Sequence, residues 1–326
     1  MSLEDVGGLR RNGFIPLSDI TTTQLDGTLD AGSYLDDFTM PALKRFYDEH
    51  IVGQERAKKA MAQIIYSTFE HENGVSTNLF AGPPGSGKSE LIRVTCAEFP
   101  KCTHVWDMSM VQGSGWKGVS IDQLAKEIPN DGRKHIVFMD EFCKIINQRN
   151  TEVSYHLVLQ GNLLRMFEHD KSMFQGCSPE NITFIAFGAF DDIYAKKKTR
   201  KKHIGFSCAP VEESPEHIEI TAEDLEGIGF MSQLCSRFDR IITLDEPDYA
   251  LYRSLAEKVV PKLEAMMERP ITVRPEVLDA LAKEALSVSA GSRLIRSRLR
   301  VLCEDFLFDN PYARSIELDV RPAMDM

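Results

Sequence analysis

The feature that most restricts the fold of this chain is a glycine-rich segment, Gly82-Pro83-Pro84-Gly85-Ser86-Gly87-Lys88-Ser89. It matches the pattern G-x-x-x-x-G-K-[ST], in which glycines let backbone N–H groups turn inward around phosphates. A short apolar run, Asn78 to Ala81, precedes the segment, and a helical pattern, Ser89 to Phe99, follows it. The sequence therefore predicts a strand, a phosphate-binding loop and a helix, with Lys88 on the phosphates and Ser89 on Mg²⁺.

A second pattern that bears on nucleotide chemistry is the apolar run Ile136 to Met139, which ends at Asp140 and Glu141. One carboxylate, Asp140, can hold the Mg²⁺ shell through water, and the next, Glu141, can orient or deprotonate the attacking water. The adjacent glutamate favours hydrolysis over phosphoryl transfer to a metabolite. Together with the phosphate loop, the pattern predicts an ATPase that uses ATP and Mg²⁺.

Short apolar runs alternate with helical or polar stretches along the chain, which is typical of an α/β fold with a mostly parallel sheet. After Leu244 comes the breaker Asp245-Glu246-Pro247-Asp248, and the remainder is mainly helical. We therefore expect an irregular extension over residues 1–40, a large α/β domain over 41–246 and a small helical domain over 247–326. The predicted strands are Asn78 to Ala81, His104 to Met108, His135 to Met139, Ile182 to Ala186 and Arg240 to Leu244.

Composition excludes several classes of protein. The chain has 326 residues, of which 43% are hydrophobic and 27% charged, so it is neither mainly disordered nor fibrous. Its net charge is −11, from 38 Lys plus Arg against 49 Asp plus Glu, which disfavours a dedicated nucleic-acid-coating protein. The seven cysteines form no C-x-x-C pair, which is typical of a reducing compartment. The most apolar run, Ile182 to Phe190, is too short to span a membrane, so we expect a soluble, cytoplasmic protein.

The segment Ile51 to Lys59 carries an apolar pair, Ile51 and Val52, beside a glycine. Such a pair can sandwich a base or be buried at the start of a helix, and the residues alone leave both possibilities open. Taken with the motifs above, the chain resembles the AAA+ ATPases, and specifically the ClpX branch of the Clp unfoldases, in consistent order over roughly residues 42–320. The resemblance implies an AAA+ P-loop NTPase core and a place for Ile51 and Val52 against the adenine.

The segment Gly115-Trp116-Lys117-Gly118 resembles the G-aromatic-x-G pore loop with which this family grips a polypeptide. Flanking glycines permit a mobile, exposed tip, and a large ring can push on any side chain without selecting a sequence. From chemistry alone, Trp116 could equally anchor a partly buried loop. The resemblance implies a translocation role.

The stretch Gly229 to Arg240 resembles the part of the family that carries an arginine finger, and Arg237 is the matching position. Such an arginine stabilises transition-state charge at the γ-phosphate of the neighbouring subunit. Because each site then needs the next subunit, the resemblance implies a ring, here a homohexamer. The alternative is a surface salt bridge, with Arg240 as the rival residue.

The block Gly291-Ser292-Arg293-Leu294-Ile295-Arg296 resembles the segment of the helical domain whose last arginine, Arg296 here, senses nucleotide. Helical spacing puts Arg293, Arg296 and Arg300 on one face, with Arg298 away from them. A basic face of this kind is most often merely solvated. The resemblance implies instead that ATP bridges the two domains and that hydrolysis drives a hinge motion between them.

The tripeptide Ile204-Gly205-Phe206 resembles the loop that docks ClpX and its close relatives into hydrophobic clefts on the ClpP peptidase ring. A glycine between two apolar residues on a polar loop makes a projecting hydrophobic tip. The alternative is a loop that folds inward. The resemblance implies a ClpP-type peptidase as partner.

The chain also departs from the family pattern. No cysteine-rich stretch precedes the motor, so we expect the zinc-binding domain of the family to be absent. The loop between Glu141 and Asn181 is expected to be shortened, and only a basic loop, Lys196 to His203, could substitute for its substrate-reading element. At the sensor position after the Ile182 strand no polar side chain is obvious, and Asp191 is the candidate.

These patterns lead to one hypothesis and two alternatives. The leading hypothesis is a ClpX-like, ATP-dependent protein unfoldase and translocase that threads unfolded or tagged proteins past Trp116, as the ATP-binding subunit of a Clp protease. The first alternative is a stand-alone remodelling chaperone without a peptidase. The second is a nucleic-acid motor or loader that uses Lys196 to His203, which the acidic composition disfavours.

Overall fold

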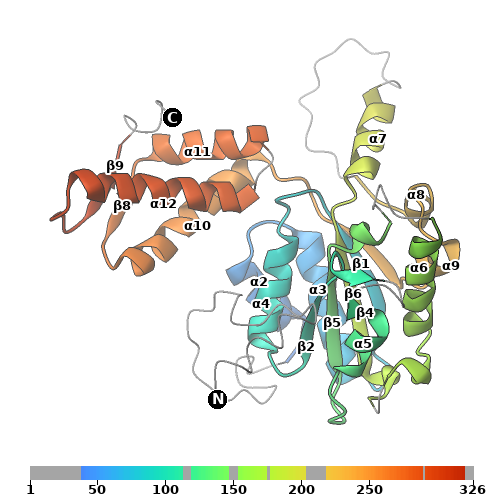
Figure 1. Cartoon of the computed structure of the whole chain (residues 1–326). Helices are drawn as coiled ribbons and strands as arrows, with labels where there is room; N and C mark the ends of the chain where they lie inside the picture. Colours follow the sequence, from blue (N-terminus) through green and yellow to red (C-terminus); the bar gives the residue numbers. More distant parts are fainter. Residues whose placement is uncertain are drawn as a thin grey trace. The chain divides into compact units, whose positions relative to one another are not determined.

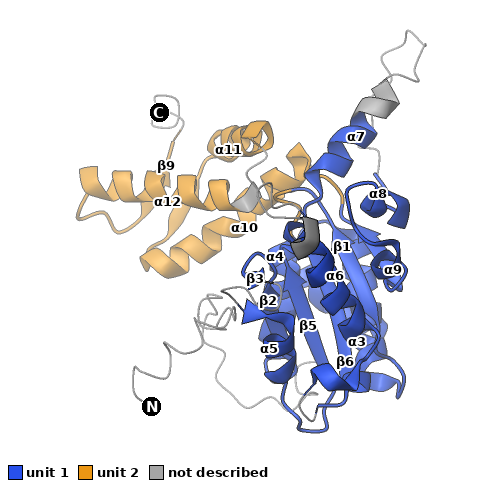
Figure 2. Cartoon of the chain, turned by 45° about the vertical axis from the view of Figure 1, so that its right-hand side comes forward, with its two compact units in different colours: residues 1–83, 88–212, 216–244 blue, residues 84–87, 213–215, 245–326 orange. Residues whose placement is uncertain are grey.

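The structure is a computed structural model of the chain and divides it into two compact units (Figure 1). The larger unit ends at Leu244, and the smaller one consists of Asp245–Met326 together with Pro84–Gly87 and Glu213–Pro215. Figure 2 colours the two units separately. The described residues are 38–112, 119–146, 153–174, 177–202, 218–288 and 291–319.

The first unit is built on a parallel sheet with the strand order β2-β5-β6-β1-β7. Ala81 of β1 lies beside Gly188 of β6, and Asp107 of β2 lies beside Asp140 of β5. Because all these pairings are parallel, the carboxyl ends of the strands meet at one edge, where ligands bind in open α/β sheets. The predicted fold class is confirmed. The strands are β1 (Thr77–Ala81), β2 (Thr103–Asp107), β5 (His135–Asp140), β6 (Ile182–Gly188) and β7 (Arg240–Thr243).

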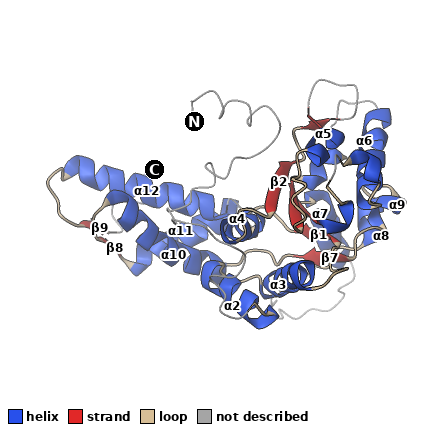
Figure 3. Cartoon of the chain, turned by 90° about the horizontal axis from the view of Figure 1, so that it is seen from below, coloured by secondary structure: helices blue, strands red, loops and turns tan. Residues whose placement is uncertain are grey.

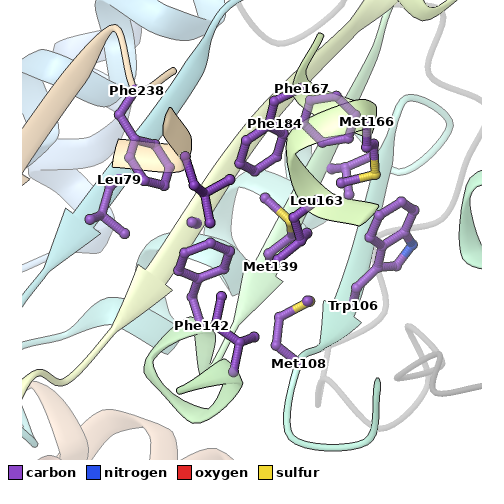
Figure 4. Close-up of a cluster of buried hydrophobic side chains, with 14 of the residues drawn as sticks. Leu79, Trp106, Met108, Met139, Phe142, Leu163, Met166, Phe167, Phe184 and Phe238 are labelled. Atoms are coloured by element: carbon purple, nitrogen blue, oxygen red, sulfur yellow. The ribbon is translucent and has the colours of Figure 1, made fainter. Parts of the chain in front are cut away.

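One face of this sheet carries a large apolar core (Figure 4). Alternate strand residues point to opposite faces, so Leu79 and Phe184 enter this core while their neighbours along the strands do not. Two helices, α5 (Ile121–Lys126) and α6 (Val153–Phe167), cover this face. Burial of both sheet faces explains why the strands are near-continuous apolar runs rather than alternating ones.

The opposite face packs against α2 (Met40–His50), α3 (Glu55–Glu70) and α4 (Lys88–Glu98). The aromatic rings of Phe80 and Phe187 stack there with their centroids 5.0 Å apart. Figure 3 shows α2 and α3 on one side of the strands and α5 and α6 on the other. The unit is therefore a three-layer α/β/α structure that leaves the carboxyl edge of the sheet to the loops.

The segment between Glu141 and Asn181 was expected to be a shortened loop, but its described residues are largely helical. Helix α6 occupies much of it and buries Leu159, Leu163 and Met166 in the core. These residues recur at steps of four and three, which is the signal of an amphipathic helix. Short 3₁₀ helices flank α6: η3 (Phe142–Ile145), η4 (Lys171–Met173) and η5 (Pro179–Asn181).

The basic run was also expected to be a loop, but Lys196–Lys202 belongs to helix α7 (Asp191–Lys202). Lysine and alanine are good helix formers, which explains how so polar a segment is helical. The Lys197 ammonium contacts the Asp224 carboxylate at 2.5 Å and so ties α7 to α8 (Ala222–Glu226).

The second unit is mainly helical, as predicted for this part of the chain. The three helices among its described residues enclose a core of their own that includes Ala256, Leu281 and Leu299. Sequence analysis missed the small parallel pair of β8 (Ile271–Val273) and β9 (Ile316–Leu318), because three-residue strands carry too little pattern. The helices are α10 (Tyr249–Met267), α11 (Pro275–Val288) and α12 (Gly291–Asp309).

Three further short elements complete the first unit: β3 (Val111–Gln112), which pairs with β4 (Val119–Ser120), and α9 (Ser232–Cys235). Within the described part of the chain, no helix is long and apolar enough to cross a membrane.

Candidate nucleotide-binding site

The phosphate loop follows β1 and leads directly into α4. The Gly82 N–H donates to the Gly188 carbonyl at 3.0 Å, so the neighbouring strand β6 holds the start of the loop. Gly85 and Gly87 have φ angles of +79° and +95°, left-handed values that residues with a Cβ seldom adopt. The loop ends at the N-terminus of α4, where the first backbone N–H groups have no partner within the helix and can bind an anion.

Lys88 is the first residue of α4 and closes the loop on itself. Its ammonium donates to the Gly82 carbonyl at 2.5 Å and to the Pro83 carbonyl at 2.9 Å. Burial lowers the pKa of Lys88, while the negative charges of Asp140 and Glu141 act in the opposite direction. The phosphate loop and the carboxylates of β5 are thus close enough to interact electrostatically.

Two serines of the loop have environments that fit a phosphorylated ligand and its metal. Ser86 is 1% exposed, and its hydroxyl has no hydrogen-bond partner among the described residues. A buried hydroxyl without a partner costs free energy, so a polar ligand that bonds to it is stabilised. Ser89 is exposed in the first turn of α4 and offers a hydroxyl oxygen of the kind that Mg²⁺ binds. The residues present therefore fit a nucleotide with Mg²⁺.

Asp140 ends β5, and Glu141 follows it at the carboxyl edge of the sheet. The Glu141 N–H donates to Asp140 Oδ1 at 2.9 Å. Burial raises the pKa of Asp140, and the nearby charges of Glu141 and Asp107 raise it further. A bound cation would relieve this crowding of negative charge, so the environment of Asp140 suits a metal ion.

Sequence analysis did not single out Asp107, although a signal for it existed. Asp107 ends β2 directly beside Asp140, and the Ser109 backbone N–H and hydroxyl donate to it at 2.9 and 2.6 Å. It ends an apolar run, as Asp140 does, and parallel strands bring such ends together. The sensor candidate Asp191 is the first residue of α7, and its charge partly opposes the burial that lowers the pKa of Lys88.

The apolar pair proposed to contact adenine lies between α2 and α3. Ile51 is buried in the core beside α2 and α3, whereas Val52 is half-buried. The two residues that follow, Gly53 and Gln54, have left-handed φ angles of +65° and +57°. The Ile51 side chain thus already has apolar neighbours within the protein, and Val52 is the more accessible of the two.

Arg237 lies at the opposite edge of the sheet from the phosphate loop. It precedes Asp239, whose carboxylate accepts a hydrogen bond from the Thr77 N–H at the start of β1, at 2.7 Å. The Arg237 guanidinium pairs with Glu168, and both side chains are largely exposed. The rival residue Arg240 donates to the Gln63 side chain at 2.9 Å.

Arg296 lies on α12 in the second unit, and its side chain is exposed. Arg293 and Arg300 are also exposed, whereas Arg298 is half-buried and pairs with Glu284 at 2.8 Å. This arrangement is the face predicted from helical spacing.

Several predicted site residues lie outside the described residues. They are the pore-loop residues Gly115, Trp116, Lys117 and Gly118 and the docking residues Ile204, Gly205 and Phe206. Residues 1–37 of the predicted N-terminal extension and His203 of the basic run also lie outside them.

Comparison with protein families identifies the class of the first unit. The model of the "ATPase family associated with various cellular activities (AAA)" matches residues 78–205, which begin in β1 and include the phosphate loop and the Asp140 strand. The first unit therefore contains an AAA ATPase domain, and this supports nucleotide binding and ATPase activity.

Similarity over most of the chain is more specific. The chain is 24% identical to the ATP-dependent Clp protease ATP-binding subunit ClpX of Borrelia duttonii and of Borrelia recurrentis, over 86% of this chain and 76% of each relative. It is 25% identical to the protein of the same name from Azotobacter vinelandii, over 82% of this chain and 73% of the relative. These similarities support a ClpX-like AAA+ protein, as the motifs predicted.

We predict that Gly188→Ala destabilises the protein and weakens nucleotide binding. An added Cβ would lie 2.5 Å from the Phe190 ring and 3.2 Å from the Cys143 backbone nitrogen. Phe190 is buried in the apolar core, so moving its ring overpacks that core at a cost of about 1–3 kcal/mol. Thermal unfolding and titration with a fluorescent ATP analogue measure the two effects.

The matched control is Gly161→Ala on α6, where an added Cβ meets no atom within 4 Å. Alanine favours a helix over glycine, so this variant should be more stable by about 0.5–1 kcal/mol and bind nucleotide normally. Equal stability and affinity for the two variants would contradict the proposed role of Gly188 in holding the loop.

Proposed function

We propose that this ClpX-like protein is an Mg²⁺- and ATP-dependent protein unfoldase that works as a hexameric ring. The observation that carries the ATPase part is the convergence of Lys88, Asp140 and Glu141 at the carboxyl edge of the parallel sheet. The name of its relatives, an ATP-binding subunit of a Clp protease, supports a protein substrate and a peptidase partner.

In the proposed mechanism, the loop Gly82–Ser89 surrounds the phosphates with backbone N–H groups, and Lys88 neutralises the β- and γ-phosphates. Ser89 and Asp140 would hold Mg²⁺, Asp140 through water, and Ile51 and Val52 would border the adenine. Bound Mg²⁺ supplies neutralisation of the charge that develops on the phosphates. Glu141 accepts a proton from the attacking water.

Replacement of the proposed base tests this mechanism directly. We expect Glu141→Gln to lower the rate of ATP hydrolysis at saturation by about 100-fold or more, because an amide cannot take up the proton. ATP affinity should stay close to that of the wild type, since Lys88 and the loop are intact. Phosphate release and equilibrium binding are measured side by side, with Glu180→Gln, which pairs with Lys171 on the surface, as the control. Normal ATP hydrolysis by the Glu141→Gln variant would contradict the proposed role of Glu141 as the base.

The position of Arg237 supports a role at the site of a neighbouring subunit. Arg237 is anchored near Thr77 at the start of β1, whereas the phosphate loop begins after Ala81. The strand between them spans about 13 Å at 3.3 Å per residue, and the loop extends further, beyond the reach of an arginine side chain. An arginine on this edge is therefore suited to a γ-phosphate bound by another subunit, once it leaves Glu168.

Mixed rings test this arrangement. Arg237→Ala and Lys88→Ala should each be inactive alone, but an equal mixture should recover activity. In randomly mixed rings, about a quarter of the sites pair an intact phosphate loop with an intact arginine from the neighbour. ATPase activity before and after mixing is the measurement, and Arg240→Ala serves as control and should stay active alone. Failure of the mixture to recover, or loss of activity in Arg240→Ala alone, would contradict the assignment to Arg237.

We also propose that Arg296, in a small helical domain over residues 247–326, is the residue that senses nucleotide. Its exposure on α12, beside Arg293 and Arg300, supports this proposal because a basic exposed face attracts phosphate. Hydrolysis then changes the contacts of Arg296 and moves the helical domain.

The unfoldase and protease parts of the proposal are tested with a ClpP-type peptidase and a folded fluorescent reporter protein that loses its fluorescence on unfolding. We expect the Trp116→Ala variant to keep most ATPase activity but to degrade less reporter per ATP hydrolysed. The reason is that the proposed pore loop loses the indole side chain that grips the polypeptide. Substitution of Ile204 and Phe206 by serine should keep ATPase and unfolding but abolish degradation. Degradation that survives this substitution would contradict docking through Ile204 and Phe206. Unfolding by the wild type without any degradation would favour a stand-alone chaperone, and ATPase activity stimulated by DNA would favour a nucleic-acid motor.

A further inference from the structure

A buried cysteine, Cys143, has its thiol next to the carboxylate of Glu141, the proposed catalytic base. Cys143 is in the 3₁₀ helix η3, two residues after Glu141, and is only 9% exposed. Its Sγ lies 4.0 Å from Glu141 Oε2, with a geometry in which the thiol donates to the carboxylate. Among the described residues, this thiol is the one hydrogen-bond partner of the Glu141 carboxylate.

The backbone on both sides of this contact is constrained. Glu141 has a φ angle of +55°, a left-handed value that costs a residue with a Cβ some free energy and persists only where the surroundings impose it. The Glu141 N–H is held by Asp140 Oδ1 at 2.9 Å. The backbone of Cys143 packs closely against Gly188 of β6. A Cβ added to Gly188 would lie only 3.2 Å from the Cys143 backbone nitrogen.

Cys143 also belongs electrostatically to the nucleotide site. It lies within electrostatic range of Lys88, as do Asp140, Glu141 and Asp191. Another described cysteine of the same core, Cys177, has a thiol that bonds instead to the Ser178 carbonyl. Proximity to Lys88 and Glu141 thus distinguishes Cys143 from a cysteine that only fills space.

We propose that Cys143 is a positioning residue for Glu141. Its thiol donates a weak hydrogen bond to the carboxylate and holds it in the orientation from which it takes a proton from the attacking water. The inference rests on the proposed role of Glu141 as the base. The thiol makes no contact with substrate and transfers no proton itself.

The chemistry of the contact decides the size of the effect. An S–H group is a weak donor, and the separation is long, so the contact biases the orientation of the carboxylate rather than locking it. Removal of the donor leaves an exposed carboxylate on a short, constrained turn with several orientations open to it. The rate of the chemical step should fall modestly, while nucleotide binding should be unaffected because Lys88 and the loop remain.

The experiment compares Cys143→Ala, Cys143→Ser and Cys177→Ala in the full-length protein. We expect Cys143→Ala to lower kcat by about threefold to tenfold at unchanged KM, since only a step after binding is affected. Cys143→Ser, which keeps a donor, should recover much of the rate.

The controls separate positioning from packing. Cys177→Ala removes a buried thiol from the same core and should leave both kcat and KM as in the wild type. A Cys143→Ala variant with normal kcat would overturn the inference, as would a loss of rate that is equally large in Cys143→Ser.

Glu141→Gln, measured in the same assays, distinguishes failure of this inference from failure of the proposed function. If Glu141→Gln is inactive while Cys143→Ala behaves as the wild type, the base is supported and only the role of Cys143 is overturned. If Glu141→Gln hydrolyses ATP normally, the proposed base itself is wrong, and the role of Cys143 is overturned with it.

Discussion

The parallel pairing of β1 with β6 is the constraint on which the nucleotide site depends. It places Ala81 beside Gly188, and the Gly82 N–H then bonds to the Gly188 carbonyl at the first residue of the phosphate loop. On its other edge β6 pairs with β5, which carries Asp140. A slip of one residue in either pairing would turn every strand residue to the other face and separate the loop from the carboxylates. The apolar side chains on both faces oppose such a slip.

Charged side chains gather at the carboxyl edge of this sheet, where they are partly buried. Lys88 is held by carbonyls of its own loop, while Asp140 sits in an environment that raises its pKa. Burial disfavours the charged form of each group, and each is stabilised by a ligand of opposite charge: Lys88 by a phosphate, Asp140 by a cation. The site is therefore electrostatically prepared for a nucleotide together with a metal ion.

Local patterns predicted much of this protein. The strand before the phosphate loop, the loop and the strand that ends at Asp140 were all placed from short motifs, because their signals lie within a few neighbouring residues. Two segments were misjudged. Composition suggested a loop at Lys196, although lysine is a good helix former, and the helical spacing of Leu159, Leu163 and Met166 was overlooked. The first error came from giving more weight to the polarity of the segment than to its helix propensity. The second came from giving more weight to the family resemblance than to the helical periodicity of the apolar residues.

The sequence by itself determined the class of the protein, the position of the glycine-rich loop and the residue types that the proposed site has at Lys88, Asp140 and Glu141, because residue type and short-range order suffice for these. Only the tertiary structure decided which residues meet. Asp107 comes beside Asp140 through strand pairing, Arg237 lies at the far edge of the sheet from its own phosphate loop, and Cys143 reaches Glu141 because a strained turn folds back. Such contacts depend on sheet order and backbone turns, which are set by packing over the whole unit rather than by neighbouring residues.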